Sequence, residues 1–263
     1  MSIHPTAVID PAAELAPDVT VAPYAVIEGH TQIAAGCEIG SFAVIRAYTV
    51  LGPRCQVAPG AVLGGLPQDG KFKGERSWLR LGADNRISEF VTLHRASGEE
   101  QATVIGERNL IMAYAHVGHN CVVGNDVLIA NAVAIAGHCL VEDYVNLGGL
   151  AAIHQFVRIG TMAMVGGLSR IARDAPPYIL VEGNPARPRS VNVRGLQRRG
   201  VPESTRDALR RAFRLLFRSE YNVGDALRRI LETETEPPPE LLHLVEFMQQ
   251  VNEGERGRQL NPH

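Results

Sequence analysis

The amino-acid sequence predicts an all-β solenoid that occupies most of the chain, followed by a C-terminal α-helical domain. Branched aliphatic residues recur at every sixth position over 3–63, 81–93 and 105–171. The residue four positions after each of them is Ala, Cys, Ser, Thr or Val in 23 of the 26 hexads. After Gly200 this pattern ends, and apolar residues recur at a helical spacing instead.

A period of six residues fits neither an amphipathic helix nor a coiled coil. The strands of an ordinary β-sandwich would not keep one phase through so many units. In a solenoid, each hexad supplies a short strand and a turn, and three hexads complete a triangular coil. Residues three hexads apart then stack in neighbouring coils, about 4.8 Å apart. The aliphatic side chain points inward, and the small residue fits where two faces of the prism meet.

The composition agrees with a narrow core. Of the 263 residues, 45% are hydrophobic but only 5% are aromatic, so Val, Ile, Leu and Ala must fill the interior. The formal net charge of −2 gives no reason to expect nucleic-acid binding, and the apolar fraction excludes intrinsic disorder. All four cysteines occupy the small inward position, where we expect reduced thiols that act as small hydrophobic groups. They are Cys37, Cys55, Cys121 and Cys139.

Two insertions interrupt the hexads, at about 69–78 and 98–103. A solenoid expels such segments as loops on one face, and these loops often carry binding groups. Because the hexads end near Pro176, we divide the chain into a solenoid over 1–190 and a helical domain over 191–263. The sequence shows neither a secretory signal nor a transmembrane stretch, so we expect a soluble intracellular protein.

Three helices are predicted in the second domain. The first opens at Pro202, and the second starts at Asn222 or Asp225. Pro237–Pro239 separate a third helix around 241–251, and we expect residues 254–263 to be frayed. The apolar face of the first helix consists of Leu209, Phe213, Leu216 and Phe217.

Histidines gather on one edge of the predicted prism. Stacking at intervals of three hexads places four of the nine histidines within three coils, and it places His119, Gly137 and Gln155 in one column. Histidines on an outward edge are not needed for packing, so their grouping predicts a functional site. The four are His116, His119, His138 and His154. The others, His4, His30, His94, His243 and His263, are not expected to join them.

Two chemistries suit such a cluster. His116, His119 and His138 offer three imidazoles to a zinc ion. Alternatively, one neutral histidine acts as a general base on a hydroxyl or an amine, with the backbone N–H near Gly137 stabilising an oxyanion. The sequence contains no phosphate-binding loop of the G-x-x-x-x-G-K-[S/T] type.

The motifs of the chain resemble those of the hexapeptide acyltransferases, and most closely those of the bacterial UDP-N-acetylglucosamine O-acyltransferase family. The hexad itself is only moderately specific, whereas the H-x-x-H, H-Q-F and G-L-x-R-R-G segments in this order are highly specific. The matching segments are 68–72 (QDGKF), 115–121 (AHVGHNC), 136–138 (AGH), 152–156 (AIHQF), 164–167 (MVGG), 176–178 (PPY), 182–184 (EGN) and 195–200 (GLQRRG).

The resemblance implies a left-handed parallel β-helix, a handedness that the hexads alone do not reveal. It also implies a cytoplasmic homotrimer with active sites between subunits. The implied reaction moves a 3-hydroxyacyl chain from acyl carrier protein to the 3-OH of UDP-N-acetylglucosamine, the first step of lipid A biosynthesis. No metal and no cofactor of the enzyme's own is implied, since the donor carries its phosphopantetheine. Neither nucleic acid nor stable membrane insertion is expected.

Roles follow from the same resemblance. His119 matches the general base, and the Gly137 N–H matches the oxyanion donor. Gly167 matches the position that sets acyl length, where the missing side chain should leave room for a longer chain. The residues that match the substrate-binding positions are Gln68, Asp69 and Lys71 for the sugar and its phosphate, His138 and Gln155 for the substrate and pantetheine, His116 and His154 as supporting residues, and Asn192, Arg198 and Arg199 for the nucleotide diphosphate.

The sequence departs from the family pattern at two positions, and rival functions remain open. Asn120 stands where the family often has Asp, and Pro185 stands where some members have His. A related family N-acylates a 3-O-acyl glucosamine, but its members usually carry an extra N-terminal domain, whereas these hexads begin at Ile3. Two further rivals are acylation of an amino-sugar acceptor, which would give an amide, and a zinc hydratase on the same solenoid.

Overall fold

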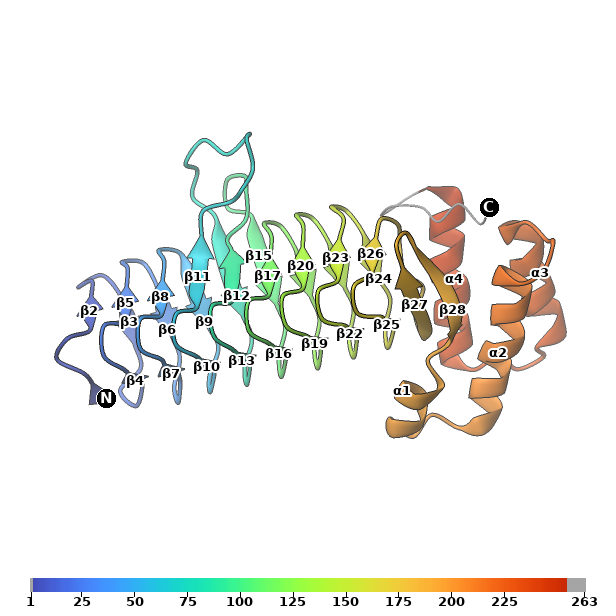
Figure 1. Ribbon diagram of the computed structural model, residues 1–263, viewed down its shortest axis with the longest axis horizontal. Helices are drawn as coiled ribbons and strands as arrows, with labels where there is room; N and C mark the ends of the chain where they lie inside the picture. The colour runs from blue at the N-terminus through green and yellow to red at the C-terminus, as the bar shows by residue number, and fades with distance from the viewer. Residues whose placement is uncertain (1, 255–263) are drawn as a thin grey trace.

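The computed structural model describes residues 2–254, which form a long triangular prism capped by helices (Figure 1). Three parallel sheets make the sides of the prism, and each coil contributes one strand to each sheet. We call them sheets A, B and C. Sheet A contains β1 (Ser2–Ile3), β4 (Thr20–Val21), β7 (Glu38–Ile39), β10 (Gln56–Val57), β13 (Arg86–Ile87), β16 (Leu110–Ile111), β19 (Leu128–Ile129), β22 (Asn146–Leu147), β25 (Met164–Val165), β27 (Ile179–Gly183) and β28 (Ala186–Val191).

The other two sheets are built in the same way. Sheet B contains β2 (Val8–Ile9), β5 (Val26–Ile27), β8 (Val44–Ile45), β11 (Val62–Gly65), β14 (Thr92–His94), β17 (His116–Val117), β20 (Ala134–Ile135), β23 (Ala152–Ile153) and β26 (Arg170–Ile171). Sheet C contains β3 (Glu14–Leu15), β6 (Gln32–Ile33), β9 (Thr49–Leu51), β12 (Trp78–Leu81), β15 (Ala102–Ile105), β18 (Val122–Val123), β21 (Leu140–Val141) and β24 (Arg158–Ile159). Among the described strands, only β28 runs antiparallel to its neighbour, β27.

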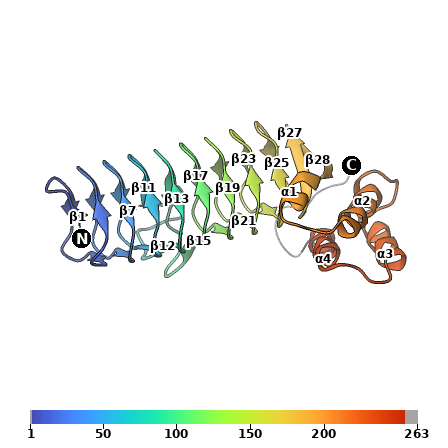
Figure 2. The same ribbon diagram turned by 90° about the horizontal axis from the view of Figure 1, so that it is seen from below.

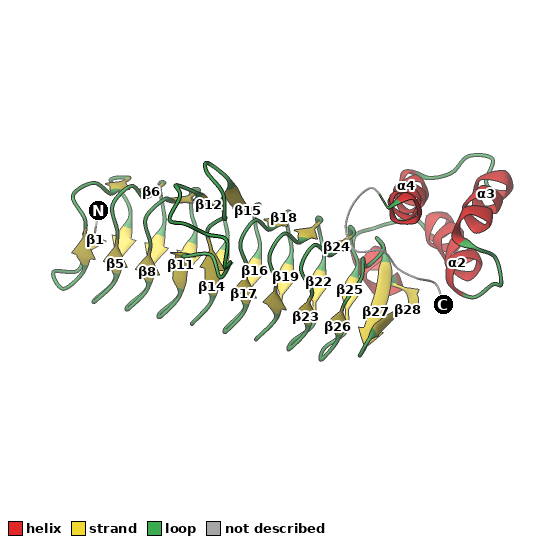
Figure 3. Ribbon diagram, turned by 90° about the horizontal axis from the view of Figure 1, so that it is seen from above, coloured by secondary structure: helices red, strands yellow, loops and turns green. Residues whose placement is uncertain are grey.

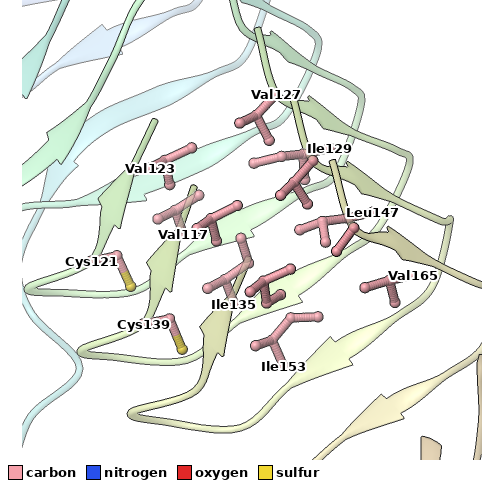
Figure 4. Packing of buried hydrophobic residues seen from close by; sticks show 14 of the residues in the cluster. Val117, Cys121, Val123, Val127, Ile129, Ile135, Cys139, Leu147, Ile153 and Val165 are labelled. Atoms are coloured by element: carbon pink, nitrogen blue, oxygen red, sulfur yellow. The ribbon is translucent and has the colours of Figure 1, made fainter. Parts of the chain in front are cut away.

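The predicted stacking register is confirmed. Val117 pairs with Ile135, and Ile135 pairs with Ile153, each three hexads further along the chain. These aliphatic side chains form a single file inside the prism, as Figure 4 shows. Cys121 and Cys139 stack beside them, and all four cysteines are buried and unoxidised, as expected.

Two buried asparagines take the small inward position and stack against each other. The Asn85 side chain donates to the carbonyls of Gly82 and Gly106, and it accepts from the Asn109 N–H at 3.0 Å. Asn109 in turn accepts from the Val127 N–H at 2.8 Å. Polar side chains are tolerated here because the asparagine ladder satisfies their hydrogen bonds within the core.

Turns join the sheets at three corners of the prism. We name them the A–B, B–C and C–A corners after the sheets they connect. Near each corner one residue adopts a left-handed backbone, as at Asn120 (φ 58°) and His138 (φ 61°). The preceding corner residue has an N–H that the strand ladder does not use, and proline therefore fits there without loss of a hydrogen bond. Prolines at this place are Pro5, Pro11, Pro17, Pro23, Pro53 and Pro59.

Both insertions leave the prism on the same side (Figure 1). Loop 1 covers residues 66–77 between β11 and β12, and loop 2 covers 95–101 between β14 and β15. The loops are bonded together, since the Glu75 carboxylate of loop 1 accepts from the Gly98 N–H of loop 2 at 3.2 Å. Glu100 of loop 2 also accepts from the indole of Trp78, the first residue of β12, at 2.9 Å. Such mutual bonding holds two long loops in one arrangement beside the prism.

Within the described residues, four helices follow the solenoid (Figures 2 and 3): α1 (Val193–Arg198), α2 (Glu203–Phe217), α3 (Val223–Thr233) and α4 (Pro239–Glu253). Three match the predicted helices, with Asn222 as the N-cap of α3. Helix α1 was not predicted; it has only six residues and buries Leu196 alone. The expected fraying concerns residues that, apart from Gly254, lie outside the described part. Within residues 2–254, no helix is both long and apolar enough to cross a bilayer.

Candidate active site

The predicted column of His119, Gly137 and Gln155 is confirmed at the B–C corner. The three residues follow β17, β20 and β23, which pair in register in sheet B. The His138 N–H donates to the His119 carbonyl at 2.9 Å, and the Phe156 N–H donates to the Gly137 carbonyl at 3.1 Å. Each coil is therefore bonded to the next directly beneath this column, which gives the side chains a rigid base.

The His119 ring lies over Gly137. A Cβ atom added to Gly137 would stand 2.6 Å from His119 Nε2 and 2.7 Å from Cε1, so no other residue fits beneath this ring undisturbed. The Gly137 N–H is the corner N–H that the ladder leaves unused, and no group within residues 2–254 accepts from it. A ring nitrogen thus lies over a residue whose backbone donor is uncommitted.

Asn120 fixes the tautomer of His119. The Ser97 N–H donates to Asn120 Oδ1 at 2.9 Å, and Asn120 Nδ2 donates to the Ser97 carbonyl at 3.0 Å, so the orientation of the amide is settled by backbone groups. His119 Nδ1 lies 2.9 Å from the same Oδ1. An amide oxygen only accepts, so Nδ1 carries the proton, and in the neutral ring Nε2 is left with its lone pair.

The other histidines of the cluster surround this one. The His138 ring packs edge-on against His119 at 5.1 Å and stacks on Phe156 at 4.8 Å. His116 Nδ1 lies 2.8 Å from the Thr92 hydroxyl. On the coil after that of His138, His154 Nδ1 lies 3.1 Å from the carbonyl of the adjacent residue, Gln155. Burial and the nearby His119 lower the pKa of both His116 and His138, which keeps these rings neutral at pH 7.

His94 also belongs to the cluster, contrary to the sequence-based expectation. Its ring packs edge-on against His116 at 4.8 Å and covers Gly65, where a Cβ atom would stand 2.9 Å from the ring. The three-hexad interval failed because loop 2 lies between the two residues, and the pairing of Thr92 with His116 spans the length of four hexads instead. Only the insertion length could have revealed this neighbour.

His94 makes the protein sensitive to acid. Burial, with smaller contributions from His116 and His119, lowers the pKa of His94 to about 4, and the side chain is only 9% exposed. Below about pH 6.5 the unfolded chain takes up a proton that the folded protein does not bind. Stability therefore falls as the pH drops from about 6.5 toward 4, by about 2 kcal/mol at pH 5.

We expect His94→Gln to reduce this acid sensitivity. Urea unfolding at pH 7 and pH 5 measures it, because the variant should lose about 2 kcal/mol less between the two conditions than the parent protein. The remaining histidines are the same in both proteins, so their contributions cancel in the comparison. Equal losses in parent and variant would contradict this assignment.

Loop 1 brings opposite charges to the histidine cluster. The Lys71 N–H donates to Asp69 Oδ1 at 3.0 Å, which closes a tight turn. This bond, the nearby Ser97 side chain, and the charges of His119 and Lys71 lower the pKa of Asp69. For His138, whose pKa is lowered mainly by burial and by His119, Asp69 makes a smaller contribution that raises the pKa, and Lys71 makes one that lowers it. Asp69 and Lys71 therefore lie within electrostatic reach of the cluster, while Gln68 beside them is exposed.

The residues matched to the nucleotide diphosphate gather elsewhere. Asn192, Arg198 and Arg199 line a pocket of about 290 Å³ together with Asp126, Asn146, Met162 and Gly195. Its remaining wall is Tyr144, over which the Arg199 guanidinium lies at 4.0 Å. Tyr144 and Met162 follow strands of sheet C, so this pocket adjoins the C–A corner. Sequence reasoning missed Asp126 and Tyr144, although they stand three hexads apart in one corner column.

A single chain does not unite all of the matched residues. His119, His138 and Gln155 stand at the B–C corner, the arginine pocket adjoins the C–A corner, and Gly167 follows β25 at the A–B corner. Within residues 2–254, no three His, Cys, Asp or Glu side chains converge as metal ligands would. The imidazoles of the cluster contact one another mainly through ring edges and faces.

Two family models match the chain. One, described as "Udp N-acetylglucosamine O-acyltransferase; Domain 2", covers residues 174–258, and the bacterial transferase hexapeptide repeat covers 30–65 and 102–137. A protein of Alkalilimnicola ehrlichii named acyl-[acyl-carrier-protein]--UDP-N-acetylglucosamine O-acyltransferase is 50% identical over 256 residues, which are 96% of this chain and 98% of that protein. The chain belongs to the UDP-N-acetylglucosamine O-acyltransferase family. A Synechocystis relative of the same name is 47% identical over 76% of this chain and 72% of its own.

Solved structures of this acyltransferase family have the same fold. The LpxA structure from Acinetobacter baumannii superposes with a TM-score of 0.92 at 37% identity, covering 98% of this chain and 99% of its own. The UDP-N-acetylglucosamine acyltransferase from Arabidopsis gives 0.84 at 32% identity, covering 98% and 100%. The fold is a left-handed parallel β-helix with C-terminal helices, as the resemblance implied.

Proposed function

We propose that the chain transfers a 3-hydroxyacyl group from acyl carrier protein to the 3-OH of UDP-N-acetylglucosamine, the first step of lipid A biosynthesis, with His119 as the general base. The observation that carries this proposal is the proton-free Nε2 of His119, which lies over Gly137, a residue whose N–H is uncommitted. Relatives at 40–50% identity bear the name of this reaction. Acyl transfer needs both a base and an oxyanion donor at one place.

The proposed mechanism follows from this pair. His119 Nε2 removes the proton of the sugar hydroxyl while the hydroxyl oxygen attacks the thioester carbonyl. The Gly137 N–H donates to the oxyanion of the tetrahedral intermediate, in which the negative charge is greatest. The intermediate then collapses, its carbon–sulfur bond breaks, and the imidazolium gives its proton to the departing thiolate of the pantetheine arm. Neither a metal nor a cofactor of the enzyme takes part, and the phosphopantetheine arm arrives with the donor.

The surrounding residues would orient the two substrates. Lys71 offers a cation to the phosphate, and the Asp69 carboxylate accepts from sugar hydroxyls. Neutral His116 and His138, together with His154 and Gln155, would line the path of the pantetheine arm. Gly167 follows Gly149 along the A–B corner, and the absence of side chains there would admit a long acyl chain.

Production of a free thiol tests the proposed activity. A 3-hydroxyacyl carrier protein is incubated with the enzyme, and thiol release is followed with and without UDP-N-acetylglucosamine. We expect release that depends on the nucleotide sugar and reaches one thiol per sugar consumed. Release at the same rate without the sugar would indicate a thioesterase and contradict the proposal.

Asn120 in place of a carboxylate should shape the pH dependence. A general base must be neutral to act, so the rate rises with pH as the imidazolium loses its proton. In Asn120→Asp, a carboxylate beside Nδ1 stabilises the imidazolium, and the rising limb of the kcat/KM profile should move to higher pH. Asp tolerates the left-handed backbone of this position about as well as Asn. Superimposable profiles between pH 5.5 and 9 would contradict the role given to Asn120.

A homotrimer would bring the three corners together, and we propose this assembly. The A–B corner carries a stripe of exposed apolar side chains along the prism, of the kind that marks a protein interface. The stripe consists of Tyr24, Phe42, Phe90, Tyr114, Leu150 and Leu168. Parallel copies joined there would place Gly167 of one subunit near the B–C corner of another. The nucleotide sugar and the carrier protein also make the cytoplasm the proposed location.

Light scattering on a sizing column tests the assembly. We expect three chains per particle, and we expect Phe42→Asp with Tyr114→Asp to shift the protein to monomers without thiol-release activity. The matched control is Val122→Asp, which changes an exposed side chain on sheet C. A parent protein that is monomeric and fully active would contradict the proposed trimer.

A further inference from the structure

Helix α4 is joined to the solenoid through a histidine that the proposed chemistry does not use. His243 Nε2 lies 3.1 Å from Glu142 Oε2, and its Nδ1 lies 3.0 Å from the Tyr178 hydroxyl. A carboxylate only accepts, so Nε2 carries a proton and donates to Glu142. Both ring nitrogens are therefore engaged, one with the last coils of the prism and one with the segment that leads into β27.

Tyr178 connects His243 to the N-terminal end of α1 through hydrogen bonds. It is only 5% exposed; its N–H donates to the Thr161 carbonyl at 2.7 Å, and its carbonyl accepts from the Asn192 N–H at 2.7 Å. Asn192 is the N-cap of α1: its Oδ1 accepts from the Gly195 N–H at 3.1 Å, and its Nδ2 donates to the Met162 carbonyl at 2.8 Å. Helix α1 carries Arg198, and Arg199 follows it.

Glu142 reaches the opposite wall of the same pocket. Its Oε2 also accepts from the Thr161 N–H at 2.8 Å and from the Thr161 hydroxyl at 2.7 Å. Thr161 precedes Met162, and Glu142 stands two residues before Tyr144; both Met162 and Tyr144 line the arginine pocket. Glu142 thus connects His243 of α4 to the two corner segments that carry Tyr144 and Met162.

We propose that His243 is a positioning residue for the pocket at the C–A corner, which it aligns through Tyr178 and Glu142 so that Arg198 and Arg199 receive the diphosphate of a nucleotide sugar. The inference rests on the proposed function, which supplies this ligand class. Two neighbouring arginines that line one pocket suit a diphosphate, because guanidinium groups match phosphate oxygens in pairs. A histidine that acts through other residues should affect nucleotide affinity more than turnover.

The charges around His243 give the arrangement a pH dependence. The Glu142 carboxylate raises the pKa of His243, Glu246 on the same helix adds to this, and burial opposes it. Tyr178 stays neutral, since burial together with Glu240 and Glu142 raises its pKa. The ion pair is therefore favoured at pH 6.5 and is lost as the pH rises through the raised pKa of His243. Affinity for the nucleotide sugar should fall over the same range.

Calorimetric titration of the full-length protein with UDP-N-acetylglucosamine, without acyl donor, tests the proposal between pH 6.5 and 9. The diphosphate of this ligand is a diester and does not titrate there. We expect His243→Gln to bind about threefold to tenfold more weakly at pH 6.5 and to lose most of the pH dependence. Its kcat at saturating sugar should stay within about twofold of the parent value. The control is Gln249→Ala on the exposed face of α4.

Tyr178→Phe separates positioning from simple loss of folding, because it keeps the buried ring and both backbone bonds. We expect it to weaken binding while it retains the pH dependence that comes from Glu142. His243→Gln with unchanged affinity and an unchanged pH profile would overturn the inference. If His243→Gln does not fold, unchanged binding by Tyr178→Phe would overturn it. A parent protein that binds no UDP-N-acetylglucosamine at any pH would instead contradict the proposed function itself.

Discussion

His119→Ala should reduce turnover by about a thousandfold or more while the protein keeps its fold. The variant removes the ring nitrogen that lies free of a proton above Gly137, and the backbone donor and the binding residues remain. Thiol release from the acyl carrier protein at saturating UDP-N-acetylglucosamine measures the loss. Because the base acts in the transition state, kcat should fall far more than the affinity for the sugar.

The matched control for this prediction is His30→Ala. His30 occupies the same B–C corner near the N-terminal end of the prism, where it stacks on Tyr48 at 5.5 Å. His30→Ala should leave turnover unchanged, and circular dichroism should show the same β-sheet signal for His30→Ala and His119→Ala. Turnover by His119→Ala within about tenfold of the parent rate would refute the role of general base.

Gly137→Ala should cost about a hundredfold in kcat, although it adds a single methyl group. That methyl group would stand 2.6 Å from His119 Nε2, so the imidazole must move away from the reacting atoms. The backbone of Gly137 does not have a positive φ, so the change itself strains no turn. Displacement of a catalytic group by about 1 Å is enough for a loss of this size.

Gly29→Ala provides the comparison, since Gly29 occupies the equivalent place at the B–C corner. A Cβ atom there meets only the exposed Asp10 carboxylate and the Ala12 methyl group, at 3.0 Å or more. We expect full activity from Gly29→Ala, and we expect Gly29→Ala and Gly137→Ala to have equal thermal stability. If Gly137→Ala kept the parental kcat, the contact between this glycine and the catalytic ring would have no functional meaning.

The repeat made the prism predictable. One aliphatic and one small residue per hexad determine the register, and stacking at every third hexad then placed His119 above Gly137 and beside His138. This reasoning works because each coil contacts only its neighbours, so a local rule extends along the whole domain. It failed for His94, where an inserted loop lengthened the interval between stacked residues by one hexad.

Other parts of the site depend on contacts that no periodicity describes. The tautomer of His119 follows from the backbone of Ser97, which loop 2 brings to Asn120. Helix α1 is too short to show an apolar face in the sequence, and its N-cap, Asn192, is also held by hydrogen bonds to Tyr178 and Met162, which lie far from it in the sequence. Such features become visible only when the loops and the helical cap are placed against the prism.

The product of the reaction tests the central claim most directly. UDP-N-acetylglucosamine is incubated with the enzyme and an equimolar mixture of C10, C12 and C14 3-hydroxyacyl carrier proteins, and the product is analysed by tandem mass spectrometry and mild alkaline hydrolysis. We predict one acyl chain, drawn mainly from the longer donors, joined to the 3-oxygen of the sugar through an ester that alkali cleaves. An alkali-resistant amide, or an unmodified nucleotide sugar, would contradict the account.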